Sequence, residues 1–148
     1  MRTSLNHHQR VNVIGALLVT PGGRRVRLRA RWHRHNVTGE EVIAFLRHLL
    51  RQTRGPLLSV WDNAPTHERR KVQQLIGAQP RLHVENFPRY APELNPAEFV
   101  WTQVEEYTAG TAPAGVSELR GNVQAALRRT RRSQRRMQAC LKASALKW

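Results

Sequence analysis

Acidic side chains are scarce in this chain, whose only aspartate is Asp62. Ten acidic residues stand against 25 lysines and arginines, which gives a formal charge of +15. Such an excess predicts attraction to a polyanion, and nucleic acid is the commonest polyanion inside cells. Arginine heavily outnumbers lysine, which favours phosphate contacts because guanidinium groups match phosphate oxygens. The alternative is a basic structural or ribosome-associated protein whose charge only keeps it solvated.

Cysteine and long apolar runs are equally scarce. Cys140 is the only cysteine, so an internal disulfide is excluded and a reducing compartment is expected. No four cysteine or histidine ligands stand at zinc-site spacing. The longest apolar stretch, Val13 to Val19, is too short to span a bilayer, and the N-terminus lacks the apolar core of a secretory signal. We therefore expect a soluble protein without membrane contact, which is cytoplasmic, or nuclear if the cell has a nucleus.

The length of 148 residues predicts a single domain, and the first apolar segments predict strands. Val11 to Val19 is apolar on both alternating faces, which is typical of a strand buried on both sides with a neighbour at each edge. After a turn at Pro21-Gly22-Gly23, the residues Val26, Leu28 and Ala30 alternate with arginines. That alternation indicates a half-exposed strand at a sheet edge.

The rest of the chain alternates between helices and strands. Thr38-Gly39-Glu40-Glu41 has the pattern of a capping box, and apolar residues then repeat at helical spacing as far as Leu50. Asn95 can cap a later helix, with Pro96 at its first position. The other expected elements are strands at 57–61 and 82–87, helices at about 66–76 and from about 117, and a hinge at 108–115. This order is typical of an α/β fold with a mixed sheet.

Two acidic residues stand where α/β proteins place ligand-binding groups. Asp62 ends the expected strand 57–61, and the carboxyl ends of strands line the usual ligand crevice. Glu98 follows after 35 intervening residues, in the first turn of the helix that Asn95 caps, where the helix dipole keeps a carboxylate ionised. Two ionised carboxylates that meet need a cation between them, and hard oxygen ligands select Mg²⁺ or Mn²⁺. Metal-activated water at such a site cleaves phosphodiesters.

Each of these residues also has a purely structural interpretation. Asp62 can form an Asx turn before the next helix, and Glu98 can complete a capping box with Asn95. His67 can be an exposed residue at a helix start. Tyr90 can stack on a base, although packing against its own proline-rich loop is favoured. Composition alone does not choose between the two interpretations of the carboxylates.

Two segments taken together resemble a known family. They are Asp62-Asn63-Ala64-Pro65-Thr66-His67 and Phe87-Pro88-Arg89-Tyr90-Ala91-Pro92-Glu93-Leu94-Asn95-Pro96-Ala97-Glu98-Phe99-Val100-Trp101. Mariner-like DDE transposases, especially those of bacterial insertion sequences, carry a D-N-x-x-x-H segment followed at similar spacing by P-x-Y-S-P-E-L-N-P-I-E-x-x-W. Ala91 and Ala97 replace the usual serine and isoleucine. The resemblance extends more weakly from Val11 to about Leu127.

The resemblance implies a ribonuclease H-like fold, in which helices flank a mixed sheet. It implies that Asp62 and Glu98 are the second and third catalytic carboxylates and ligands of Mg²⁺ or Mn²⁺. The family's first aspartate lies on a first strand, which we expect upstream of this chain. The other residues expected near the site are Asn63, His67 and Asn95.

The absence of that first strand predicts consequences for folding and for activity. In the family the first strand lies between the second strand, here Val11 to Val19, and the strand that ends at Asp62. Without it, Val11 to Val19 is expected to lack one hydrogen-bonding partner, and the chain alone is expected not to cleave DNA. An upstream half of the transposase, made from another reading frame or as another polypeptide, is the expected partner; a homodimer is the other possibility.

The sequence predicts a partial catalytic domain at residues 1–127 and a basic C-terminal tail at 128–148. The run from Arg128 to Arg136 is either a DNA-binding surface or a solvated segment. The leading hypothesis is a transposase fragment whose parent enzyme cleaves and joins DNA with a divalent metal. The alternative is a non-catalytic, basic DNA-binding remnant. The residues expected to bind nucleic acid are Arg89, Arg128, Arg129, Arg131, Arg132, Arg135 and Arg136.

Overall fold

The computed structural model describes residues 2–6, 9–66 and 69–147, and the chain divides into two compact units. Unit 1 joins Met1–His35 to Glu93–Trp148, whereas unit 2 is the intervening segment Asn36–Pro92. The single domain expected from the length is thus divided within the region predicted to be catalytic. Within the described ranges, no helix has the length and apolar character needed to cross a membrane.

Unit 1 is built on a three-stranded antiparallel sheet in the order β1-β2-β3. Its strands are β1 (Arg2–Asn6), β2 (Gln9–Val19) and β3 (Val26–His33), and a short 3-10 turn at Pro21–Gly23 joins the last two. The register of β2 and β3 places Val26, Leu28 and Ala30 on one face of β3 and its arginines on the other, where they lie opposite Ile14, Ala16 and Leu18 of β2. The expected half-exposed strand with a charged face is therefore present.

The strand β1 pairs only with the beginning of β2. Thr3 lies opposite Val11 and Arg2 lies opposite Asn12, and beyond Asn12 the described residues provide β2 with no partner other than β3. Val11, Asn12 and Val13 are buried, whereas residues 14–19 of β2 are only half-buried. The predicted lack of one partner is therefore confirmed from Val13 onwards and wrong for Asn12, which pairs with both β1 and β3, whereas Val11 pairs with β1 alone among the described strands.

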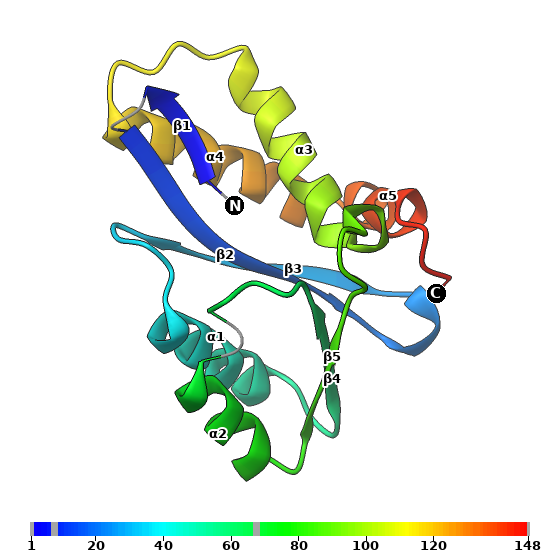
Figure 1. Cartoon of the computed structure of the whole chain (residues 1–148). Helices are drawn as coiled ribbons and strands as arrows, with labels where there is room; N and C mark the ends of the chain where they lie inside the picture. The colour runs from blue at the N-terminus through cyan, green and yellow to red at the C-terminus, as the bar shows by residue number, and fades with distance from the viewer. Residues whose placement is uncertain (1, 7–8, 67–68, 148) are drawn as a thin grey trace. The chain divides into compact units, whose positions relative to one another are not determined.

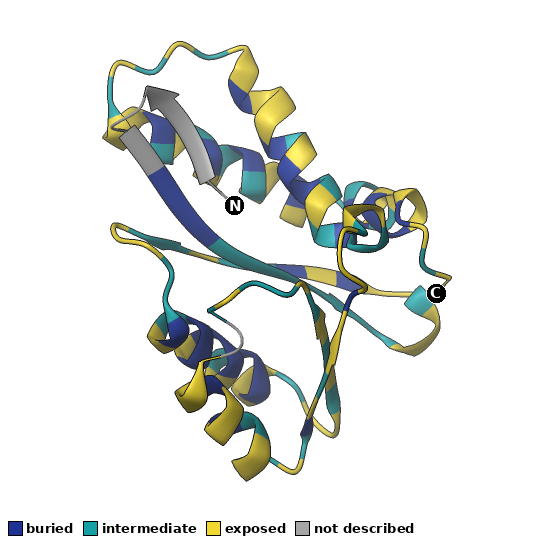
Figure 2. Cartoon of the chain, in the orientation of Figure 1, coloured by how far each residue is buried: buried dark blue, intermediate teal, exposed yellow. Residues whose placement is uncertain are grey.

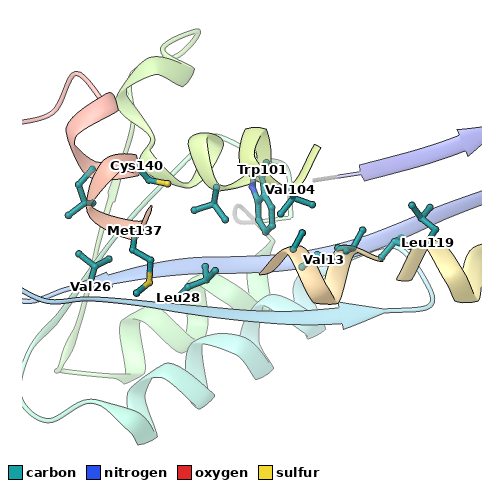
Figure 3. Packing of buried hydrophobic residues seen from close by; sticks show 13 residues of the cluster. Val13, Val26, Leu28, Trp101, Val104, Leu119, Met137 and Cys140 are labelled. Atoms are coloured by element: carbon teal, nitrogen blue, oxygen red, sulfur yellow. The ribbon is translucent and has the colours of Figure 1, made fainter. Parts of the chain in front are cut away.

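Three helices cover one face of the unit 1 sheet (Figure 1). They are α3 (Pro96–Ala109), α4 (Val116–Arg131) and α5 (Gln134–Ala143). Figure 3 shows their apolar side chains meeting those of β2 and β3 in one cluster. The buried members of this core are Val11, Val13, Val26, Leu28, Val100, Trp101, Val104, Leu119, Val123, Ala126, Met137, Cys140 and Leu141.

Trp101 of α3 packs closely against Gly15 of β2. A Cβ atom built on Gly15 would lie only 2.7 Å from Cη2 of Trp101, a distance that real Cβ atoms essentially never show. Trp101 is itself buried. The helix α3 can thus lie this close to the sheet only because position 15 carries no side chain.

The expected tail from residue 128 is part of the folded unit. The helix α4 continues to Arg131, and α5 buries Met137, Cys140 and Leu141 in the unit 1 core. The side-chain amide of Gln134 also donates to Val26 O at 2.6 Å and accepts from Val26 N at 3.1 Å. It thereby pairs the outer edge of β3 as another strand would. The prediction of a tail was wrong because the many arginines of this segment obscured the helical spacing of Met137, Cys140 and Leu141.

Unit 2 holds a two-stranded parallel sheet and two helices. Its elements are α1 (Gly39–Gln52), β4 (Leu57–Trp61), α2 (Arg70–Ala78) and β5 (Leu82–Asn86). The predicted capping box is present, because the hydroxyl of Thr38 and the carboxylate of Glu41 cap the start of α1. One side of α1 is buried and the other exposed (Figure 2). The helix expected to begin at Thr66 instead begins at Arg70.

The described strands form two sheets where one mixed sheet was expected. The ladder β1-β2-β3 is antiparallel and the ladder β4-β5 is parallel, and no strand of the described residues bridges β2 and β4. One face of β4 correspondingly exposes Leu58 and Val60, which are 61 % and 39 % accessible.

The contact between Gly15 and Trp101 gives a first prediction. Replacement of Gly15 by alanine forces Trp101 to move, and overpacking of this kind costs about 1–3 kcal/mol. Urea denaturation followed by tryptophan fluorescence measures the change. The matched control is Gly121→Ala, because Gly121 is exposed on α4 with nothing within 4 Å of a built Cβ. We expect this control to raise stability by about 0.5–1 kcal/mol. Equal effects of the two substitutions would contradict the packing.

The burial of Cys140 gives a second prediction. Its side chain is 1 % exposed, and burial raises the pKa of the thiol from 9.0 to about 11. Because the thiolate is the reactive form, a disulfide reagent at pH 8 is expected to label Cys140 only when unit 1 opens. The labelling rate should rise with urea in parallel with unfolding. Rapid labelling of the native chain would show that α5 is not packed on the sheet.

Candidate active site

Asp62 follows β4 directly, at the end of the parallel pair β4-β5. Trp61 lies opposite Asn86 in the register, and Phe87 N donates to Trp61 O at 2.8 Å just beyond the ladder. The Asp62 side chain is exposed, and its Oδ1 accepts a hydrogen bond from Ala64 N at 3.1 Å. The Asx turn considered from the sequence is therefore present. It fixes the carboxylate at the strand end without burying it.

Asn63 joins the two loops that leave this end of the sheet. Its Nδ2 donates to Phe87 O at 3.0 Å, so the turn after β4 is held to the start of the loop after β5. Phe87 is buried and gives the loop a fixed origin. Asp62 and the loop from Phe87 to Pro92 thus start from one rigid edge of unit 2.

Glu98 lies in unit 1, in the first turn of α3. The start of this helix is determined by Asn95, whose Oδ1 accepts from Ala97 N at 3.1 Å, and by Pro96 at the first helical position. The Glu98 side chain is exposed.

The candidate residues are divided between the two units. Asp62 and Asn63 are adjacent in unit 2, and Asn95 and Glu98 are joined by the helix start in unit 1. His67 lies outside the described residues. The strands β1, β2 and β3 carry no aspartate or glutamate at all. The described sheet of unit 1 therefore supplies no carboxylate that would join Asp62 and Glu98.

Positive charge is concentrated in unit 1, which holds 17 lysines and arginines against 5 glutamates, a formal +12 of the chain's +15. The candidate DNA-binding arginines of this unit occupy the last turn of α4 and the start of α5. At the end of α4 they also complement the helix dipole. Arg89 lies in unit 2 and is exposed. The exposed residues of the unit 1 run are Arg128, Arg129, Arg131, Arg132 and Arg135, whereas Arg136 is half-buried.

Sequence patterns did not predict a groove of about 280 Å³ between β3 and α4. Its floor is apolar, and its charged lining residues are Arg31, Arg128 and Arg131. The guanidinium of Arg120 lies 3.8 Å from the ring centroid of Trp32, the aromatic residue among those that line the groove. In the sequence, only the alternation of apolar residues and arginines in β3, taken together with the apolar stripe of α4, could have indicated that these arginines line one groove.

Comparison with known proteins identifies the family. The profile of the DDE superfamily endonuclease family matches residues 2–120, whereas a search of curated protein sequences finds no match. Two structures of the Mos1 mariner transposase catalytic domain, one of them with raltegravir and Mg, are each 13 % identical over 93 % of this chain. They have TM-scores of 0.52 and 0.51 and are covered over 83 % and 84 % of their own length.

A structure of a simian T-cell lymphotropic virus intasome with a PP2A regulatory subunit is also similar. It is 13 % identical over 79 % of this chain, with a TM-score of 0.48, and this chain spans 46 % of the matched chain. The likeness to the Mos1 catalytic domain confirms the expected ribonuclease H-like fold. Because the family profile covers most of its residues, this chain belongs to the DDE superfamily endonuclease family.

Proposed function

We propose that this chain acts in DNA transposition as part of a transposase catalytic domain, with Asp62 and Glu98 as two of its catalytic carboxylates. The observation that carries the proposal is the position of Asp62 at the shared end of β4 and β5. Ligands of open α/β sheets bind outside the carboxyl ends of the strands. Membership of the endonuclease family makes a DNA phosphodiester the expected ligand there.

The donor atoms suit a divalent cation. Both Asp62 and Glu98 are exposed, so a hydrated ion has access to each, and carboxylate oxygens are the ligands that Mg²⁺ and Mn²⁺ prefer. We propose that each of these side chains is a ligand of such an ion. When bound, such an ion activates water and neutralises charge that develops on the phosphate. Asn63 and Asn95 have positioning roles, because each fixes the backbone beside a carboxylate.

The third carboxylate of the family's site has no counterpart on β1, β2 or β3. We propose that catalysis requires a further strand bearing an aspartate, supplied from outside the described residues. The segment of β2 from Val13 to Val19, which pairs on one side only, is the edge that such a strand would join. The branch of bacterial insertion sequences remains a prediction from the sequence.

A second candidate function is a DNA-binding protein without catalysis. The same lack of a carboxylate on the unit 1 sheet favours it, together with the concentration of positive charge in that unit. Both functions require contact with the DNA backbone, for which the exposed arginines of α4 and α5 and Arg89 are the candidates. The two functions differ only in whether cleavage can be restored.

The cleavage assay separates them. We expect the chain alone, with Mg²⁺ or Mn²⁺, to leave transposon-end DNA uncut, because one of three carboxylates is missing. Adding a polypeptide that carries an aspartate-bearing strand is expected to produce cleavage, which Asp62→Ala and Glu98→Gln both abolish. Glu85→Gln is the matched control, because it removes an exposed carboxylate of β5 that is not at the strand end. Cleavage by the chain alone that survives Asp62→Ala would refute the assigned site.

The DNA-binding proposal predicts a particular salt dependence. Each arginine that contacts a phosphate adds about one to the slope of log affinity against log salt concentration. Replacing Arg129, Arg132 and Arg135 by alanine is therefore expected to lower that slope by about 3 on duplex DNA. The control removes the same charge from unit 2, at the exposed residues Arg47, Arg51 and Arg54. Equal slopes for the two triple variants would show that the α4–α5 arginines contribute only to the net charge and do not contact phosphates.

A further inference from the structure

Tyr90 combines two properties that ordinary packing does not explain. Its side chain is 98 % exposed, and among the described residues it is the only non-glycine residue with a positive φ, at 59°. The left-handed region is disfavoured for a residue with a Cβ atom, and an exposed aromatic ring gains nothing from burial. The predicted packing of Tyr90 against its proline-rich loop is therefore wrong. The backbone strain at Tyr90 is therefore not offset by burial of its side chain.

The loop around Tyr90 holds this conformation in place. Its origin is fixed by the buried Phe87, whose backbone is bonded to Trp61 and to the side chain of Asn63. Pro88 precedes the tyrosine by two residues and Pro92 follows it by two, and each proline ring fixes its own φ. A loop held at its origin and stiffened on both sides keeps Tyr90 directed away from unit 2. Strain maintained in this way is typical of functional positions.

The neighbours of Tyr90 indicate what it contacts. Arg89 precedes it in the sequence and is exposed, and the loop starts at the same C-terminal end of the β4-β5 pair as Asp62. A guanidinium group matches a phosphate, whereas the face of a tyrosine ring matches the face of a base. The exposed residues within two positions of Tyr90 in the sequence are Pro88, Arg89 and Pro92, and of these only Arg89 is charged.

We propose that Tyr90 stacks on an unpaired base of the DNA strand and that Arg89 holds an adjacent phosphate. The pair acts as a clamp at the edge of unit 2 that presents Asp62. An unpaired base is required, because the faces of bases within a duplex are already stacked on one another. This inference rests on the proposed action on DNA and adds a contact that orients the strand.

The test compares Tyr90→Gly with the unchanged chain. Glycine relieves the positive φ, so thermal unfolding is expected to shift upwards by a few degrees. The same variant is expected to bind a single-stranded oligonucleotide about tenfold more weakly, since stacking on one aromatic side chain accounts for about that factor. Binding of a blunt duplex should not change. An oligonucleotide that contains 2-aminopurine reports the stacking directly, because its fluorescence is quenched by the native chain and not by the variant.

Two further variants provide the controls. Tyr90→Trp keeps an aromatic face and is expected to retain both affinity and quenching. Leu58→Ala removes another exposed apolar side chain of unit 2, away from the loop, and is expected to leave single-strand binding unchanged. A weaker effect of Tyr90→Trp than of Tyr90→Gly separates loss of the ring from disturbance of the loop.

Several outcomes would overturn the clamp. Unchanged single-strand affinity and quenching in Tyr90→Gly would do so, and so would a fall in thermal stability, which would make Tyr90 a packing residue. A changed sedimentation coefficient with unchanged oligonucleotide binding would instead make it a contact between protein chains. Failure of the unchanged chain to bind any DNA refutes the proposed function itself, whereas duplex binding without an effect of Tyr90 refutes only the clamp.

Discussion

The contact of Trp101 with Gly15 is the constraint on which the arrangement of unit 1 depends. The tryptophan ring occupies the space that any side chain at position 15 would need, so the distance between α3 and the sheet is determined by the absence of a Cβ atom. The start of the same helix is determined separately, by the Asn95 cap and by Pro96. Glu98 lies between these two fixed points. The buried contact of Trp101 therefore helps to set the position of the exposed carboxylate of Glu98, which lies on the same helix.

Local signals predicted the elements that carry the two carboxylates. An apolar run that stops at Asp62 and an Asn-Pro pair before Glu98 each act over a few residues, and both elements have the predicted form. The helix α5 was missed because Met137, Cys140 and Leu141 are separated by residues that resemble a solvated tail. Its docking depends on Gln134, whose partner Val26 is 108 residues away in the sequence. The pairing of β1 and the division into two units depend equally on contacts between distant segments, which no local pattern encodes.

The uneven charge of the two units gives the basic surface a physical meaning. Unit 1 carries a formal +12 and unit 2 only +3, so self-repulsion falls mainly on the unit whose sheet holds no carboxylate. The unit 1 fold tolerates this charge because its arginines lie on the exposed face of β3 and on the outer turns of α4 and α5. A bound polyanion would reduce the repulsion. Binding to DNA and stability of unit 1 are therefore expected to be thermodynamically linked.

The hydrogen bond from Asn63 to Phe87 connects the two unusual features of unit 2. On one side of it, the Asx turn of Asp62 holds a carboxylate at the strand end. On the other side, the loop that leaves the sheet holds Tyr90 at a positive φ, and burial of its side chain does not offset this strain. A strained residue such as Tyr90 persists only where the surrounding structure holds it in place. The hydrogen bond from Asn63 to Phe87 contributes to that support, and it also holds the turn that carries Asp62. Because both loops share one origin, a strand held by Tyr90 and Arg89 would keep a fixed distance from Asp62. Loss of the Asn63 amide would therefore release both loops together.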